Sequence, residues 1–235
     1  MRSPLLRSNK TTAKAFTLLE LLVVCGILLV LMGLLFPAIR AVKAQGNSSR
    51  CIANLKQIGV LLHAESADNN GVVKFQSYTT PGSTKRWNNY LIEGGYLEAS
   101  SKIPFCPSVA VSNGIMALGM GGYVYGGVIF AEASDPYSSY IDGISTSRAI
   151  RLGSIDRPSQ YWLLTDSWSL QLNHQTYYID KSSGSSNRMQ LRHQGRANTL
   201  FADGHVRGVD LSETKNYATY PLSNAFDEKG RGVTK

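Results

Sequence analysis

The chain has 235 residues and a formal net charge of +8, from 24 basic and 16 acidic residues. Four of the basic residues lie in the first 15 positions, so residues 16–235 carry 20 basic against 16 acidic residues, a net charge of +4. These charges are scattered rather than clustered, which argues against nucleic-acid binding. The length allows one long helix followed by a head domain of about 165 residues with its own hydrophobic core.

A basic segment precedes a long apolar run. Residues 1–15 contain four basic residues and no acidic one, which predicts that this segment stays in the cytoplasm. Leu21–Ile39 comprises 19 uncharged residues; extended back to Phe16, the run has 24 residues and is interrupted only by Glu20. As a helix it would be about 36 Å long, enough to cross the bilayer core. A carboxylate is costly there, so Glu20 is expected near the interface or beside a partner charge.

The segment Phe16-Thr17-Leu18-Leu19-Glu20, behind its basic leader, resembles the N-terminus of type IV prepilins and type II secretion pseudopilins. The resemblance implies that a prepilin peptidase cleaves between Ala15 and Phe16 and methylates Phe16. It also implies that Glu20 guides assembly by pairing with the N-terminal amine of a neighbouring subunit. Placing the two opposite charges in hydrocarbon as a pair costs less free energy than placing each there alone. Ala15 departs from the family, which usually has Gly before the cleaved bond.

Two simpler interpretations fit part of this segment. A Sec signal peptide would use Val42-Lys43-Ala44 as its cleavage site, but the apolar run is too long and Glu20 lies where such peptides avoid charge. An ordinary single-span anchor would make Glu20 and the Phe-Thr-Leu start accidental. The agreement of motif, leader charge and span length favours the prepilin interpretation.

The apolar run is predicted to continue as an amphipathic helix to Asp68. Pro37 predicts a kink rather than a stop, and the pilin family has a kinking proline at the same distance from the cleavage point. From Ala38 onward, apolar residues recur at steps of three or four, with most charged residues on the other side. Asn69-Asn70-Gly71 predicts the end of the helix.

The three cysteines lie in different settings. Cys25 is inside the apolar run and is expected to act as a small hydrophobic residue. Cys51 and Cys106 lie beyond the membrane in what should be an oxidising compartment, so they either form a disulfide or remain free thiols. Their spacing in the sequence does not decide between these two alternatives, because a disulfide requires the two α-carbons to lie within about 7 Å of each other.

From Val72 onward, short β-type runs alternate with turn residues. The predicted strands are Tyr123–Phe130, Tyr161–Thr165, Thr176–Ile179, Thr199–Ala202 and His205–Val209. Trp87–Leu97 has helical spacing and predicts a short helix. Because the runs are too short for parallel crossovers, the predicted fold is α+β and type IV pilin-like: a long N-terminal helix that passes from membrane-spanning to amphipathic, packed on a small antiparallel β-sheet head.

The sequence therefore divides into five parts. They are the cleaved leader (1–15), the transmembrane half of the helix (16–40), its amphipathic half (41–70), a β-rich exterior head (71–210) and a C-terminal tail (211–235). The tail is polar and weakly patterned, which predicts a covering or partly disordered segment.

A distinctive pattern near the end of the head is His193 followed, after nine residues, by Asp203-Gly204. Asp203-Gly204 between two β-type runs predicts a two-residue turn with left-handed backbone at both positions, which would pair Phe201 with Val206. This signature, and the run Cys51-Ile52-Ala53-Asn54-Leu55-Lys56-Gln57-Ile58-Gly59, resemble one branch of prepilin-like proteins.

His193, Asp203 and His205 form a weak candidate set for a divalent metal, since imidazole and carboxylate are reasonable ligands. Three ligands without an identified fourth favour the simpler interpretation, in which these side chains hydrogen-bond near the hairpin. Calcium would need more oxygen ligands. The sequence therefore predicts no metal and no cofactor.

These patterns together predict a non-enzymatic structural subunit, either a pseudopilin or a minor pilin of a type II secretion-like or type IV pilus-like filament. The resemblance implies that its partners are prepilin peptidase, other pilin or pseudopilin subunits and an inner-membrane assembly platform. It also implies a bacterial inner-membrane location, with a cytoplasmic N-terminus and an exterior head. The alternatives are a membrane-anchored surface binding module and a metal-dependent exterior enzyme built on His193, Asp203 and His205, which lacks a recognisable catalytic set.

Overall fold

The computed structural model describes residues 17–80, 83–109, 124–127, 138–139, 148–180, 185–214, 222 and 224–234. The predicted leader (1–15), which ends at Ala15, and the predicted methylated residue Phe16 lie outside these ranges. The chain divides into two compact units, residues 1–43 and 44–235, and each is described by itself.

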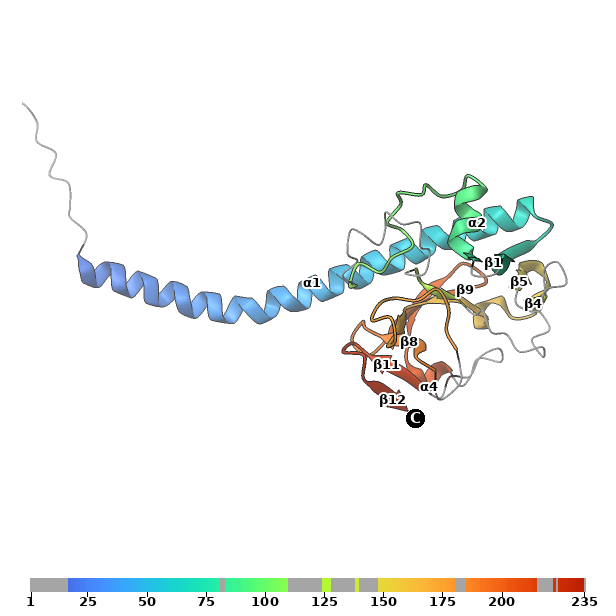
Figure 1. Ribbon diagram of the computed structural model, residues 1–235. Coiled ribbons are helices and arrows are strands. Elements are labelled where there is room, and N and C mark those ends of the chain that lie inside the picture. Colours follow the sequence, from blue (N-terminus) through green and yellow to red (C-terminus); the bar gives the residue numbers. More distant parts are fainter. Residues whose placement is uncertain are drawn as a thin grey trace, which may run out of the picture. The chain divides into compact units, whose positions relative to one another are not determined.

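Helix α1 (Leu18–Asp68) is continuous and includes Pro37 (Figure 1). In the first unit its apolar side chains are exposed, as at Leu29, whose exposed fraction is 70%. By length and composition this helix could span a membrane. It ends as predicted, because Asn70 and Gly71 adopt left-handed backbone with φ of 54° and 82°.

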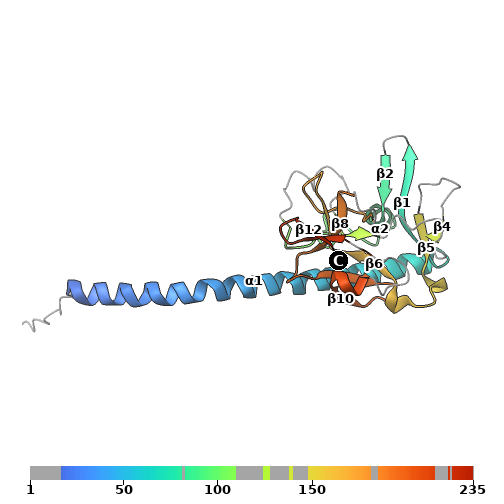
Figure 2. The same ribbon diagram turned by 90° about the horizontal axis from the view of Figure 1, so that it is seen from below.

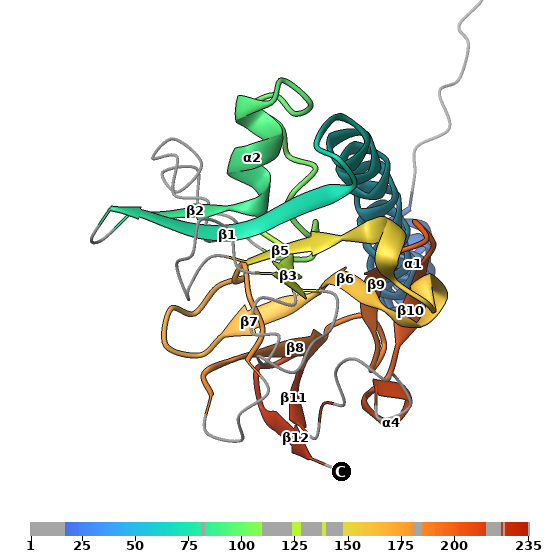
Figure 3. The same cartoon turned by 90° about the vertical axis from the view of Figure 1, so that its right-hand side faces the viewer.

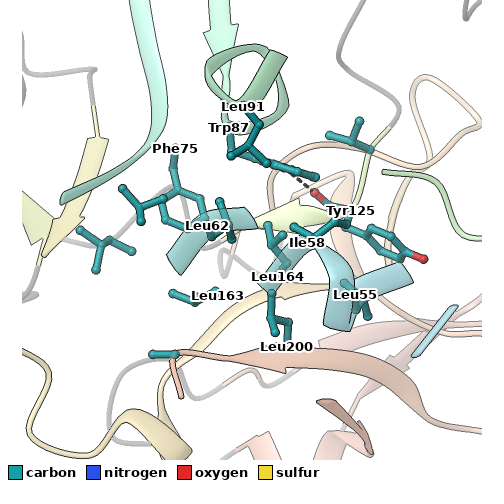
Figure 4. Close-up of a cluster of buried hydrophobic side chains, with 14 of the residues drawn as sticks. Leu55, Ile58, Leu62, Phe75, Trp87, Leu91, Tyr125, Leu163, Leu164 and Leu200 are labelled. Carbon is teal, nitrogen blue, oxygen red and sulfur yellow. Dashed lines mark hydrogen bonds between the residues drawn. The ribbon is translucent and has the colours of Figure 1, made fainter. Parts of the chain in front are cut away.

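In the second unit, α1 supplies one wall of the main hydrophobic core. Leu55, Ile58 and Leu62 are fully buried and recur at three- and four-residue steps, which places them on one face of the helix. Figure 4 shows them packed among side chains from the sheets and from α2 (Trp87–Glu93). Trp87 is also fully buried, and its Nε1 donates a hydrogen bond of 3.1 Å to the Tyr125 carbonyl. The predicted amphipathic pattern of this half is confirmed.

The described strands form three four-stranded sheets, which lie one beside the next in Figure 3. The first has the order β2-β1-β5-β4, the second β10-β9-β6-β3 and the third β12-β11-β8-β7. Figure 2 shows the β1–β2 hairpin next to α2. The strand bounds are β1 Val72–Thr80, β2 Ser83–Arg86, β3 Gly126–Gly127, β4 Ser138–Ser139, β5 Arg148–Arg151, β6 Trp162–Thr165, β7 Ser167–Ser169, β8 Asn187–Leu191, β9 Ala197–Phe201, β10 Val206–Val209, β11 Asn224–Asp227 and β12 Gly232–Thr234.

The pairing is antiparallel except between β8 and β11, which are parallel. The short helical turns are η1 (Leu152–Ser154), η2 (Pro158–Gln160) and α4 (Leu211–Thr214). A long helix with mainly antiparallel sheets confirms the α+β class.

Several predicted elements differ in their bounds. The predicted strands at Tyr161–Thr165, Thr199–Ala202 and His205–Val209 correspond to β6, β9 and β10. Thr176–Ile179 is not a strand and makes only an isolated bridge, between Tyr178 and Gly127. Of Tyr123–Phe130 only residues 124–127 are described, and they contain β3. The predicted helix at Trp87–Leu97 ends at Glu93, because the chain turns at Gly94 and Gly95, where φ is 78° at Gly95.

The described part of the stretch after residue 210 is more ordered than predicted. Strands β11 and β12 lie within it, and Leu222 and Ala225 are buried in a second hydrophobic cluster with Trp162 and Phe201. The polar composition did not predict these strands, because a short strand needs few apolar residues when a neighbouring strand supplies its hydrogen bonds.

The hairpin between β9 and β10 differs from the predicted one by one residue. Val206 lies opposite Leu200 rather than Phe201, and only Gly204 of the turn is left-handed, with φ of 85°. The Gly204 N–H donates to the Phe201 carbonyl at 2.9 Å. These features define a three-residue loop with a glycine bulge, the next most common hairpin geometry after the two-residue turn.

Candidate functional site

The second unit contains a buried cluster of two cysteines, one aspartate and one histidine: Cys51, Cys106, Asp166 and His193. One potential ligand atom from each side chain lies within 4.8 Å of all the others. Among the described residues, it is the only group of three or more such side chains whose ligand atoms converge in this way.

Each member comes from a different part of the fold. Cys51 lies on the packed face of α1, and Cys106 follows Pro104-Phe105, where its N–H donates to Gln175 Oε1 at 3.1 Å. Asp166 immediately follows β6, and hydrogen bonds with the backbone of β9 and β8 hold its peptide groups.

His193 lies just after β8, at the start of the turn that leads to β9. Its N–H donates to the Arg196 carbonyl at 2.9 Å. The intervening Gln194 and Gly195 both have left-handed backbone, with φ of 54° and 78°. The two-residue turn with two left-handed positions therefore occurs here, and it fixes the direction of the His193 backbone.

The polar atoms of the cluster approach one another closely. His193 Nε2 lies 3.2 Å from Asp166 Oδ2 and 3.5 Å from Cys106 Sγ. Cys51 Sγ lies 3.7 Å from Asp166 Oδ1 and 3.8 Å from Oδ2. All four side chains are buried, so these groups meet away from bulk water.

Three further groups surround the cluster. The Tyr125 hydroxyl donates to Cys51 Sγ at 3.3 Å, and the Asn198 N–H donates to Asp166 Oδ2 at 2.8 Å. Arg192 is buried beside Asp166, with 3.7 Å between its Nε and Oδ1, and it also donates to the Ser167 carbonyl. The carboxylate is therefore fixed by backbone and by a buried cation, as a buried charge requires.

The cluster alters the pKa values of its members. Burial raises the pKa of the Cys51 thiol well above its usual range. The pKa of Cys106 falls to about 6, because the hydrogen bond with Cys51 outweighs burial and His193 and Arg192 act in the same direction. Burial alone would lower the pKa of His193, but hydrogen bonds with Asp166 and Cys106 raise it to about 9. Cys106 is thus the more acidic of the two buried thiols.

This geometry does not suit a Cys–His–Asp catalytic relay. In such a relay the acid orients the imidazole through one ring nitrogen while the other nitrogen takes the proton from the nucleophile. Here both Asp166 and Cys106 approach the same atom, His193 Nε2, and the Cys106 thiol is buried. What the arrangement can do is bind a cation at the centre of the four side chains or join the two sulfur atoms.

The predicted pairing partners Cys51 and Cys106 do lie together, but the structure has both as free thiols. The third cysteine, Cys25, is free and exposed in the apolar half of α1.

The weak candidate metal set of His193, Asp203 and His205 does not come together. His193 belongs to the buried cluster, whereas His205 Nδ1 pairs with Asp203 Oδ1 at 2.5 Å on the partly exposed hairpin loop. The reason is topological: His193 precedes β9 and Asp203 follows it, and a five-residue strand separates its two ends by about 16 Å.

The Asp203-Gly204 turn instead lies against α1. A side-chain carbon added at Gly59 would come within 2.9 Å of Leu200 Cδ1 and 3.8 Å of the Gly204 Cα, and Gly204 itself faces His63. At the other end of β9, Asn198 Nδ2 donates to the Ser48 carbonyl at 3.3 Å. The nine-residue spacing therefore matches a strand that runs along α1, with His193 before it and the glycine turn after it.

Sequence reasoning singled out three members of the cluster but gave Asp166 no role in it. A signal existed: Asp166 directly follows the mostly apolar predicted strand Tyr161–Thr165, and a carboxylate next to a buried strand needs partners. Comparisons of the chain with protein-family models, with curated proteins and with solved structures find no match.

Proposed function

We propose that this protein is a pilin-like structural subunit, a pseudopilin or minor pilin, anchored in the membrane by the first half of α1 and carrying an exterior head. The observation that carries the proposal is the helix itself. One half exposes a continuous apolar surface around the predicted assembly residue Glu20, and the other half is built into the core of the head.

The N-terminal turn of α1 supports a role for Glu20 in assembly. The Thr17 N–H and hydroxyl each donate to Glu20 Oε2 at 2.9 Å, and the Glu20 N–H donates to the Thr17 hydroxyl at 3.2 Å. This reciprocal capping holds the carboxylate at the positive end of the helix dipole. If Phe16 becomes the first residue, Thr17 becomes the second, and Glu20 is held next to the new N-terminus.

The mechanism follows from these positions. A subunit waits in the membrane with its head outside, and the amine of Phe16 is neutralised by Glu20 of an adjoining subunit in the filament. An assembly platform lifts successive subunits out of the bilayer, and the apolar halves of α1 pack together in the core of the filament. Prepilin peptidase and other pilin-like subunits are the partners that this mechanism needs.

The first test is N-terminal sequencing of the protein extracted from membranes of a host that has prepilin peptidase. The expected first residue is N-methylphenylalanine at position 16. A protein that still begins at Met1, or that begins near Gln45 after a signal-peptidase cut, contradicts the proposal.

The second test is incorporation of Glu20→Leu into filaments, with Leu22→Ala as the matched control in the same exposed stretch. We expect Glu20→Leu to be processed and to keep a folded head, yet to be lost from sheared filaments, while Leu22→Ala is incorporated. Normal incorporation of Glu20→Leu would refute the assigned role.

A further inference from the structure

We propose that Cys51, Cys106, Asp166 and His193 bind one zinc ion in a closed, structural site inside the head. The site goes beyond the pilin-like function, because it depends on the head alone. It would join four segments that are distant in sequence: α1, the segment around residue 106, the end of β6 and the turn after β8.

The distances within the cluster fit a zinc site. Zinc binds thiolate sulfur at about 2.3 Å and imidazole nitrogen or carboxylate oxygen at about 2.0–2.2 Å, so tetrahedral ligands lie about 3.3–3.8 Å from one another. With Asp166 Oδ2 as the ligand atom, the separations here are 3.2 Å to His193 Nε2 and 3.8 Å to Cys51 Sγ, and His193 Nε2 lies 3.5 Å from Cys106 Sγ. All remaining separations are within 4.8 Å, so small side-chain movements complete the tetrahedron.

The chemical types of the four ligands favour zinc over other cations. Two sulfur ligands with one imidazole and one carboxylate suit zinc, whereas magnesium and calcium prefer sites made wholly of oxygen. The four protein ligands leave no open position and all are buried, which is the form of a structural rather than a catalytic zinc site.

The charges of the cluster balance when one zinc ion is bound. Two thiolates and one carboxylate carry three negative charges, which balance the two positive charges of zinc and the one on Arg192. Arg192 is therefore compatible with a neighbouring metal, because the complete site is neutral. A neutral assembly is what burial away from water favours.

Neighbouring groups hold the ligands in place. Asn198 holds Asp166 through its backbone N–H, and Tyr125 donates a hydrogen bond to the Cys51 sulfur. Hydrogen bonds to ligand atoms orient a metal site and tune its affinity. A surface pocket of about 300 Å³ is lined partly by Ser48, Arg192 and His193, so it reaches one of the four ligands.

The competing outcome is a disulfide between Cys51 and Cys106, which would consume both sulfur ligands and exclude the metal. Zinc binding and disulfide formation therefore make opposite predictions for the same protein. Zinc leaves three free thiols on denaturation in chelator, including Cys25, whereas the disulfide leaves one.

The experiment uses the full chain, purified in detergent without reductant or chelator from cells grown with zinc. Elemental analysis is expected to give one zinc per chain. After removal of zinc with a chelator under reducing conditions, titration with Co²⁺ should produce a thiolate-to-cobalt charge-transfer band and the intense visible absorption of tetrahedral cobalt. The melting temperature should rise with free zinc concentration, because zinc binds only the folded state tightly.

Matched variants separate the four ligands from other cysteines and histidines. Cys51→Ser and Cys106→Ser should each weaken zinc binding by more than about 100-fold, since loss of even an outer partner costs 10–100-fold. Cys25→Ser and His205→Gln should retain one zinc per chain. Asp166→Asn keeps the side-chain shape and should weaken binding while preserving the cobalt–thiolate band.

Two results would overturn the proposal. One is a wild-type protein without zinc that gives no charge-transfer band with Co²⁺ after reduction, a measurement that needs no variant to fold. The other is a Cys51–Cys106 disulfide in the protein isolated from zinc-supplemented cells. Both readouts are independent of filament assembly and N-terminal processing, so they do not depend on the proposed function.

Discussion

The two halves of α1 have similar apolar residues but opposite surroundings. Leu29, in the first unit, is 70% exposed, whereas Leu62, in the second unit, is fully buried. Both belong to one continuous helix. The first half shows leucine, isoleucine and valine on all sides, while the second half restricts them mainly to one face.

The difference identifies the medium that each half requires. A helix that is apolar all round must be surrounded by lipid or by other apolar helices, whereas a one-sided helix is completed by its own protein core. In the second half, sheets and α2 provide that core. Substitutions in the two halves should therefore affect different properties. Two pairs of variants test this, and two further pairs test the packing of the second half.

The largest effect is expected from truncating a buried side chain of the second half. Leu62→Ala should lower the free energy of unfolding by about 2–5 kcal/mol, because it leaves a cavity in a packed core. Leu29→Ala should leave head stability within about 0.5 kcal/mol of wild type. Denaturant unfolding of the detergent-solubilised chain, followed by tryptophan fluorescence, measures both, since all three tryptophans lie beyond residue 86. Equal losses in the two variants would contradict the comparison.

For membrane insertion, a substitution in the first half of α1 is expected to have the larger effect. Leu29→Arg should disfavour insertion by about 3 kcal/mol, the cost of a charge near the centre of a spanning helix. Val60→Arg changes a residue of the second half that is 69% exposed, so it should insert as wild type does. The fraction of chain retained in alkali-washed membranes measures the difference. If Leu29→Arg is retained as well as wild type, the first half is not the spanning segment.

A smaller effect is expected where α1 meets the hairpin. Gly59→Val should cost about 1–3 kcal/mol, because its first side-chain carbon would come within 2.9 Å of the buried Leu200 side chain. Gly46 has no atom within 4 Å of the same position, so Gly46→Val should be tolerated and should slightly favour the helix. Thermal melting of the two variants gives the comparison. Gly59→Val with a wild-type melting temperature would show that the helix and β9 are not closely packed.

The smallest effect concerns Glu65, a buried residue of the second half. Burial raises its pKa from 4.5 to about 7, although Lys74 and Lys85 oppose the shift. The folded state then binds a proton that the unfolded state has lost, so the free energy of unfolding falls as pH rises from about 4.5 to about 7.

Glu65→Gln should remove this loss and stabilise the head at pH 8 by on the order of 1–2 kcal/mol. The exposed Glu98→Gln serves as control and should leave the pH profile unchanged. The free energy of unfolding of the wild type and both variants, measured at pH 5 and at pH 8, tests this prediction. A Glu65→Gln profile that keeps the wild-type slope would show that Glu65 is not the group responsible.

The long helix could be predicted from sequence because its signals are local. Hydrophobic periodicity marked Leu55, Ile58 and Leu62 as the buried face, and Asn70-Gly71 marked the end. The sheets were harder to predict. Strands such as β7 and β11 are short and partly polar, and they exist because a partner strand lies beside them, which is information that no local window contains.

The site was predictable only in part for the same reason. Cys51, Cys106 and His193 attracted attention by residue type and spacing, but nothing local showed that they meet Asp166. The Asp203-Gly204 pattern was correctly assigned to a hairpin, and its register was off by one because a glycine bulge extends the loop. The hypothesis of a metal set that included His205 failed because β9 separates its members.

The separation of contacting residues along the chain also governs the order in which the head can be made. Cys51 meets Asp166 across 115 positions, and Ser48 meets Asn198 across 150. Such distant pairings close slowly, and none of them can form while the later strands are still being synthesised. During that interval both sulfur atoms of the cluster are accessible to oxidants and to metal ions. The two sulfur atoms therefore become buried only late in folding, after Asp166 and His193 have been made.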